Sequence, residues 1–330
     1  MELTTVWFVL VAALFTGYFV LEGFDFGVGI LLPVLGRDDR ERRVLINTIG
    51  PVWDGNEVWV ITAGGAMFAA FPEWYATLFS GFYLPLLLIL VALILRGVAF
   101  EYRGKRPDPR WKARWDKAIV FGSVTPALLW GIAFANIARG VPLDADHDYA
   151  GGLLDLLHPY ALLGGLVTLT LFVTHGAVFL ALKTTGDIRE RANALAGRVG
   201  LLAAALAVAF LAWTLTIRSS PAAVVLAVTA SLALAGGLIA NRVRREGWAF
   251  VGTATAIGLA VATLFAALFP DVLPSTLGSG GLTVDNASSS PYTLKIMTVV
   301  ALVFTPLVLL YQGWTYWVFR KRIGVRDIPD

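Results

Sequence analysis

Long apolar stretches separated by short polar connections recur along the whole chain. A helix of about 18 residues or more crosses roughly 30 Å of hydrocarbon at about 1.5 Å per residue. The pattern predicts nine such helices, at residues 4–35, 54–71, 74–100, 118–138, 153–182, 199–217, 222–240, 248–269 and 292–319. We therefore expect an all-α, polytopic integral membrane protein.

The polar connections are too short to form a water-soluble domain. The longest cover residues 102–117 and 270–291, fewer than a hydrophobic core requires. The second of them is rich in Gly and Ser, which predicts an irregular loop. Residues 1–330 are therefore expected to form a single membrane domain, with buried acids only among the helices of residues 4–139.

Composition and charge support this assignment and orient the chain. The sequence is 57% apolar with a mean hydropathy of +0.73, more than soluble proteins normally carry. Lys and Arg concentrate in short cytoplasmic loops of membrane proteins. Here 22 of the 26 basic residues fall in alternate connections, at residues 37–43, 103–117, 183–198, 242–245 and 320–326. This predicts an N-terminus outside and a C-terminus in the cytoplasm.

Two further counts limit the chemistry of the chain. The net charge of +3 does not require a nucleic-acid partner, because the excess basic residues lie in loops that would face anionic lipids of the inner leaflet. The absence of cysteine excludes disulfides, thiolate metal sites and iron–sulfur clusters held by this chain.

Four carboxylates lie within or at the head of predicted membrane helices. Glu22 and Asp25 are three residues apart and share a helix face, and Asp54 and Glu57 open the second helix. Ionised groups at this depth cost at least a few kcal/mol each and are functional by default. A proton relay or ion site is one interpretation of the first pair. The alternative is a pair that is hydrogen-bonded into the bundle and fixes its packing.

The string PVWDGNE at residues 51–57 is the most specific of the chain. Asp54 and Glu57 have the spacing of a capping box at a helix start. An acid at the membrane face with a second one turn deeper also suits proton entry, and the flanking Trp53 and Asn56 are not needed for a cap. Arg96, near the inner end of the third helix, either snorkels to the headgroups or pairs with Asp54 or Glu57.

Histidines are too few for a redox centre built by this chain alone. His147 falls in an outer connection. His158 and His175 share the fifth helix but are separated by about 26 Å of helical rise, so they cannot ligate one metal or haem together. We predict no metal site in this chain.

Longer strings carry a resemblance to a known family. They are EGFDFGVG at 22–29 and NTIGPVWDGNEVW at 47–59, followed by AAFP at 69–72, SGFY at 80–83, RGVAFE at 96–101 and NASSS at 286–290. With these strings the chain resembles subunit II of cytochrome bd-type quinol oxidases over nearly its whole length. The first-half strings are specific, whereas helices six to eight match mainly in hydropathy.

The resemblance implies a fold and a partner. It implies two four-helix bundles plus one peripheral helix, within residues 4–139 and 153–319, in a bacterial plasma membrane. The partner would be subunit I, which bears the two b-type haems and haem d, in a complex that oxidises quinol and reduces O2 to water. The chain would be haem-free and inactive alone. A structural quinone and small accessory transmembrane subunits are compatible with the family, but no string here fixes a quinone site.

The resemblance also assigns roles to site residues. Asp54 corresponds to the acid through which family members draw protons from the cytoplasm, and Asp25 to a helper in the first-helix motif. Glu57 stands where some relatives carry a neutral Gln. Glu22, Trp53, Asn56 and Arg96 are expected to support this path. Two alternatives remain open: a secondary transporter that binds a cation at its membrane acids, and a purely structural assembly platform.

Overall fold

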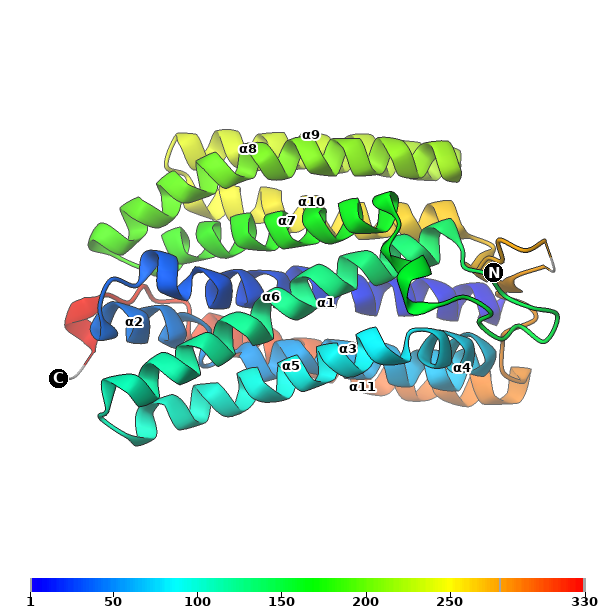
Figure 1. The fold of residues 1–330 in the computed structure, drawn as a ribbon, viewed down its shortest axis with the longest axis horizontal. Coiled ribbons are helices and arrows are strands. Elements are labelled where there is room, and N and C mark those ends of the chain that lie inside the picture. The colour runs from blue at the N-terminus through cyan, green and yellow to red at the C-terminus, as the bar shows by residue number, and fades with distance from the viewer. Residues whose placement is uncertain (1, 279, 329–330) are drawn as a thin grey trace.

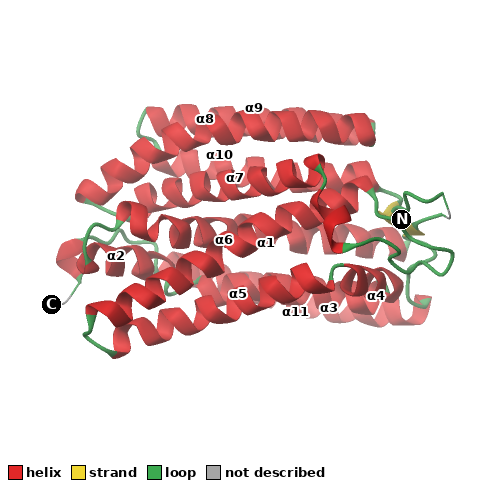
Figure 2. Cartoon of the chain, in the orientation of Figure 1, coloured by secondary structure: helices red, strands yellow, loops and turns green. Residues whose placement is uncertain are grey.

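The computed structural model describes residues 2–278 and 280–328, and its helices run lengthwise along one axis (Figure 1, Figure 2). The α-helices are α1 (Leu3–Leu35), α2 (Asp39–Ile49), α3 (Trp53–Ala70), α4 (Pro72–Gly81), α5 (Tyr83–Tyr102), α6 (Pro109–Arg139), α7 (Pro159–Lys183), α8 (Gly186–Ile217), α9 (Pro221–Arg242), α10 (Glu246–Leu268) and α11 (Pro291–Val318). Short 3-10 helices are η1 (Arg103–Lys105), η2 (Leu153–Leu157) and η3 (Val325–Asp327), and two strands are β1 (Asp271–Leu273) and β2 (Leu282–Thr283).

Helix α1 lies at the centre of the bundle. It contacts α3, α6, α7 and α10, while α8 and α9 form an outer layer and α11 lies against α1 and α3 (Figure 1). The start and the end of the chain lie at opposite ends of the molecule. We call the end that carries α2 and the C-terminal segment the α2 end.

Eight of the described helices are long and apolar enough to cross a membrane: α1, α5 with η1, α6, α7, α8, α9, α10 and α11. This confirms an all-helical, multi-pass membrane protein. The predicted second span, 54–71, corresponds to α3, which has 18 residues but is less apolar than the other eight.

The predicted span 74–100 is wrong as a single helix. It is divided into α4 and α5, with Phe82 outside helical geometry at φ −103° and ψ 19°. Pro85 explains the break, because a proline ring clashes with the carbonyl of the residue four positions earlier, here Gly81.

Other boundaries differ because hydropathy detects the membrane-embedded part of a helix and not its polar extension. Helix α6 begins nine residues before its predicted span, and α8 begins at Gly186 instead of residue 199. Helix α7 begins at Pro159, so residues 153–158 lie outside it. Helix α2 was not predicted from the apolar pattern; its N-cap Asp38 accepts a hydrogen bond from the Glu41 amide at 2.8 Å. The loop predicted at 270–291 contains the β1–β2 pair.

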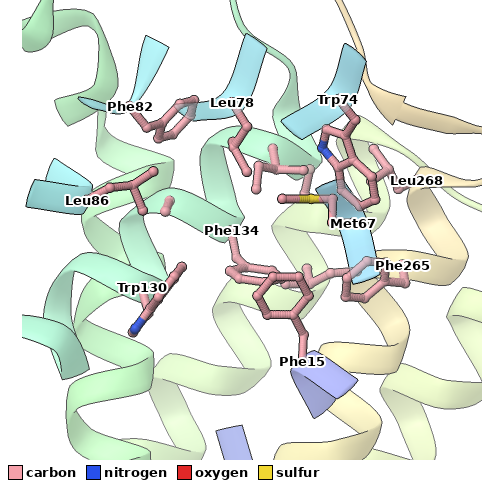
Figure 3. Close-up of a pocket in the computed structure, with 14 residues that line it drawn as sticks. Phe15, Met67, Trp74, Leu78, Phe82, Leu86, Trp130, Phe134, Phe265 and Leu268 are labelled. Atoms are coloured by element: carbon pink, nitrogen blue, oxygen red, sulfur yellow. The ribbon is translucent and has the colours of Figure 1, made fainter. Parts of the chain in front are cut away.

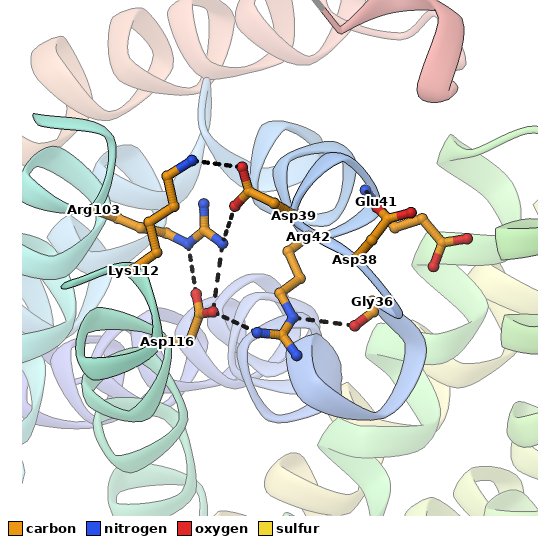
Figure 4. A network of polar contacts seen from close by, with 8 residues as sticks. All are labelled: Gly36, Asp38, Asp39, Glu41, Arg42, Arg103, Lys112 and Asp116. Atoms are coloured by element: carbon orange, nitrogen blue, oxygen red, sulfur yellow. Dashed lines mark hydrogen bonds and ion pairs between the residues drawn. The ribbon is translucent and has the colours of Figure 1, made fainter. Parts of the chain in front are cut away.

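An ion-pair network ties α2 to α6 and η1 (Figure 4). The buried Asp116 carboxylate accepts from Arg103 at 2.5 Å and from Arg42 at 2.9 Å. Asp39 accepts from Arg103 at 2.8 Å and from Lys112 at 2.7 Å. Burial opposes ionisation of Asp39, but these two hydrogen bonds outweigh it and lower the pKa of that carboxyl. The network thus fixes the position of α2 on the bundle.

Helices α1 and α7 meet backbone to backbone at two glycines. A Cβ atom on Gly27 would lie 2.0 Å from the Phe172 carbonyl oxygen and 2.8 Å from the Gly176 Cα. Only glycine permits this approach, which is how small residues bring membrane helices together. The contact places the Glu22–Asp25 segment deep in the bundle.

Gly27→Ala is therefore expected to destabilise the protein by at least about 2 kcal/mol, because the added methyl group overpacks a backbone contact. The matched control is Gly236→Ala in α9, where a Cβ would meet no atom within 4 Å and alanine improves helix propensity. Thermal midpoints of the two purified variants test this. Equal midpoints would contradict the close contact.

The core also contains a small cavity of about 20 Å³ between α1, α3, α4, α5, α6 and α10 (Figure 3). Aromatic and aliphatic side chains line it, among them Phe15, Met67 and Phe134. Its size is about that of one or two water molecules, and apolar cavities of this kind stay dry. It is a packing feature of the aromatic core and not a candidate site.

Candidate functional site

Arg96 of α5 is the centre of a buried cluster of charged residues. Its side chain has no solvent-exposed surface. Its Nη1 donates to the Glu57 Oε1 atom at 2.8 Å and to the Glu22 Oε2 atom at 3.2 Å. Of the two alternatives left open for Arg96, the structure shows pairing, with Glu57, and not snorkelling to the headgroups. The arginine joins α5 to both α1 and α3.

Aromatic rings enclose the remaining faces of this guanidinium. Its Cζ atom lies 4.9 Å from the Phe26 ring centroid and 5.1 Å from that of Phe100. Trp53 packs against Phe100 with centroids 5.2 Å apart, so it supports the cluster through packing. In the part of the chain that the structure describes, Arg96 Nε and Nη2 have no hydrogen-bond partner. Cation–π attraction to the Phe26 and Phe100 rings therefore stabilises the guanidinium where it lacks hydrogen bonds.

A second set of contacts holds Asp25. The Asn56 amide nitrogen donates to the Asp25 Oδ2 atom at 2.6 Å. The other carboxyl oxygens on this side of α1, Asp25 Oδ1 and Glu22 Oε1, are buried and have no hydrogen-bond partner within residues 2–278 and 280–328. The structure therefore places Asp25 in contact with α3 and leaves one of its oxygens available.

Asp54 stands apart from both sets of contacts. It is exposed in the first turn of α3, where its Oδ1 accepts from the Gly55 amide at 2.8 Å. The predicted capping box is wrong: Val52 is the N-cap, and the Glu57 carboxylate is taken up by Arg96. Asp54 still lies near the positive end of the helix dipole. It also lines a groove of about 460 Å³ between α3 and α11.

Helix α11 contributes two side chains that were not predicted from the sequence, Gln312 and Tyr316. Gln312 and Tyr316 line the same groove as Asp54. Tyr316 donates to the Asn56 Oδ1 atom at 2.7 Å, and Gln312 approaches that atom at 3.4 Å. One signal could have found them, because two polar side chains four residues apart on an apolar helix share a face.

The arrangement has an excess of acid over base. The buried cluster and its neighbour contain three carboxyl groups, those of Glu22, Asp25 and Glu57, and one guanidinium. If all three ionised, two negative charges would remain uncompensated in a low-dielectric interior, which is energetically costly. Such a site favours the binding of protons and their exchange among neighbouring carboxyl groups.

Hydrogen bonds hold the rings of His158 and His175. The His175 Nδ1 atom is 2.7 Å from the Thr253 hydroxyl, and its ring stacks on Phe250 at 4.7 Å. His158 uses both ring nitrogens, since Nε2 bonds Asn136 and Nδ1 accepts from Ala161. No group of three or more metal-ligating side chains occurs within residues 2–278 and 280–328. The remaining ring nitrogen of the helical histidine, His175 Nε2, is buried and has no hydrogen-bond partner among the described residues.

Comparisons with known proteins agree over the full length. The family described as "Cytochrome bd terminal oxidase subunit II" matches residues 3–319. The "Cytochrome bd ubiquinol oxidase subunit 2" of Bacillus subtilis strain 168 is 43% identical over 332 residues, which cover 99% of this chain and 98% of that protein. The "Cytochrome bd-I ubiquinol oxidase subunit 2" of Escherichia coli strain K12 is 38% identical over 362 residues, covering 98% and 96%.

A solved structure shares the fold. "The structure of bd oxidase from Geobacillus thermodenitrificans" contains a chain that superposes with a TM-score of 0.80, covering 97% of this chain and 100% of that one. The two sequences are only 18% identical, so this likeness concerns the helical architecture alone.

Proposed function

Because this chain belongs to the cytochrome bd terminal oxidase subunit II family, we propose that it carries protons from the cytoplasm toward a haem-bearing subunit I. The complex oxidises quinol and reduces O2 to water, a reaction that consumes protons. The observation that supports this role is the buried surplus of carboxyl groups around Arg96, next to a groove that exposes Asp54.

The proposed route has three stages. Asp54, which is exposed and lines the groove, collects protons from water. Asp25, held by Asn56, receives them inside the bundle through its unpartnered oxygen. Glu22 shares the α1 face with Asp25, and its ion pair with Arg96 links it to Glu57. Arg96 limits the net charge of the cluster and thereby lowers the cost of moving a proton through it.

The proposal includes nine membrane crossings, with the N-terminus outside and the C-terminus in the cytoplasm. Helix α3 would be the ninth span, since its 18 residues are about 27 Å long. Its lower hydropathy comes from the site residues that it carries. An odd number of crossings agrees with chain termini at opposite ends of the molecule, and the basic loops favour the α2 end as cytoplasmic.

The same proposal places the b-type haems and haem d in subunit I. The hydrogen bonds of both His158 ring nitrogens support this placement. Within the complex, this chain would act as an assembly partner and as a proton conductor. The residues 4–139 would form the conducting bundle, and those of 153–319 the second bundle with α11 as the peripheral helix.

Asp54→Asn in the intact complex is expected to lower quinol-driven O2 consumption roughly 3- to 10-fold, because the entrance loses its ionisable group. The start of α3 keeps a polar side chain in this variant. Oxygen-electrode turnover and proton uptake from a weakly buffered medium measure the effect. Glu101→Gln, also at an exposed acid near the α2 end, should retain wild-type rates. Unchanged turnover and proton uptake in Asp54→Asn would refute the entrance. Normal turnover per complex with reduced abundance would indicate an assembly role instead.

A further inference from the structure

Helix α11 reaches the acid cluster although little of it is buried. Among its residues, Leu294 alone is buried. Polar contacts attach it at both ends: the Trp7 indole donates to the Leu294 carbonyl at 3.2 Å, and the Lys183 ammonium donates to the Phe319 carbonyl. Between these ends, its polar side chains at 312 and 316 face α3. The middle of α11 therefore has specific polar partners on α3.

The orientation of Gln312 is determined by Trp59. An indole nitrogen can only donate, and that of Trp59 lies 2.8 Å from the Gln312 Oε1 atom. The amide of Gln312 must therefore turn its Nε2 group away from Trp59. That group points to the Asn56 Oδ1 atom, 3.4 Å away.

The orientation of Asn56 follows in turn. Its Oδ1 atom accepts from the Tyr316 hydroxyl at 2.7 Å, in addition to the approach of Gln312. An amide with its oxygen on that side presents its nitrogen on the other, where Asp25 Oδ2 accepts at 2.6 Å. The opposite orientation would set the amide oxygen against a carboxyl oxygen and lose both donors from α11.

We propose that Tyr316 and Gln312 are positioning residues that lock the Asn56 amide in the orientation in which it donates to Asp25. This inference rests on the proposed proton route. The lock holds one oxygen of Asp25 and leaves the other free for proton exchange. It also makes the proton route depend on the position of α11, because displacement of this helix removes the Tyr316 and Gln312 donors together.

Tyr316→Phe tests the lock because it deletes the hydroxyl and keeps the ring that packs edge-on against Phe24. In the intact complex, we expect turnover at saturating quinol to fall about 3- to 10-fold. The solvent isotope effect on turnover should rise. The KM for quinol and the thermal midpoint should stay unchanged. Gln312→Leu should have a smaller effect, in line with its longer contact. Tyr292→Phe, at an exposed position of α11, is the matched control.

The double variant Asp25→Asn/Tyr316→Phe separates this inference from the route itself. If Tyr316 acts through Asp25, the double variant is no slower than Asp25→Asn alone. Full additivity, or wild-type turnover in Tyr316→Phe while Asp25→Asn is slow, overturns the lock and leaves the route intact. Wild-type turnover in Asp25→Asn overturns the route and the lock together.

Discussion

Arg96→Leu is expected to cost about 3–5 kcal/mol of stability, because removal of one partner from a buried ion pair leaves uncompensated charge. The loss falls on two acids at once, since Glu22 and Glu57 share this single guanidinium. The Phe26 and Phe100 rings also lose the cation between them. A loss of this size is a large fraction of the roughly 5–15 kcal/mol that usually stabilises a domain.

The abundance of the assembled complex and its thermal midpoint measure this effect. The control is Arg114→Leu, which removes an exposed arginine of α6 and should leave both quantities near wild type. A triple variant that combines Arg96→Leu with Glu22→Gln and Glu57→Gln should regain much of the stability, because a neutral cluster carries no unpaired charge. A wild-type midpoint in Arg96→Leu, or no recovery in the triple variant, would contradict the ion-pair account.

The triple variant separates stability from function. If the charges serve only packing, a neutral cluster restores both abundance and turnover. If they serve proton transfer, abundance returns and turnover stays low, because glutamine does not exchange a proton near neutral pH. We expect the second result from the surplus of carboxyl groups over guanidinium in the cluster.

Hydropathy predicted the membrane-embedded helices well and their ends poorly. An apolar window reports transfer into lipid, so it does not register the polar extensions that begin α6 and α8. It also missed α2, whose formation depends on an Asp38 cap and on ion pairs to α6 and η1. The break at Phe82 was foreseeable from Pro85, because the effect of proline on a helix is local.

The residues of the site could be predicted from the sequence, but the contacts between them could not. Unusual acids inside apolar segments identified Glu22, Asp25 and Glu57, since their energetic cost is visible in the sequence. Which partners they have depends on how separate helices pack. From the sequence, Arg96 could either extend to the lipid headgroups or form an ion pair with an acid. The position of α5 beside α1 and α3 determines that it forms the ion pair. The contact of Tyr316 with Asn56, 260 positions apart, has no local signature.

The structure also changes the order of importance of the acids. The sequence and its family resemblance favour Asp54 as the principal residue, yet Asp54 is exposed and its carboxylate accepts a local hydrogen bond from the Gly55 amide. Water or a neighbouring group can deliver a proton in its place. Asp25 is fully buried, so no solvent molecule at the surface replaces it. We therefore expect Asp25 to control the rate of the route more strongly than Asp54.

Asp25→Asn is expected to lower turnover at least about 100-fold, the scale of a lost proton-transfer group. Asparagine has nearly the same shape, and its oxygen can still accept from Asn56, so the complex should assemble and keep its thermal midpoint. Asp25→Glu, which retains the acid but displaces it, should give an intermediate rate. Turnover and proton uptake of these variants, compared with Asp54→Asn, measure the order. A smaller loss of turnover in Asp25→Asn than in Asp54→Asn would show that protons bypass Asp25. If all protons passed through this buried acid, its removal would lower turnover at least as much as removal of the exposed acid at the entrance.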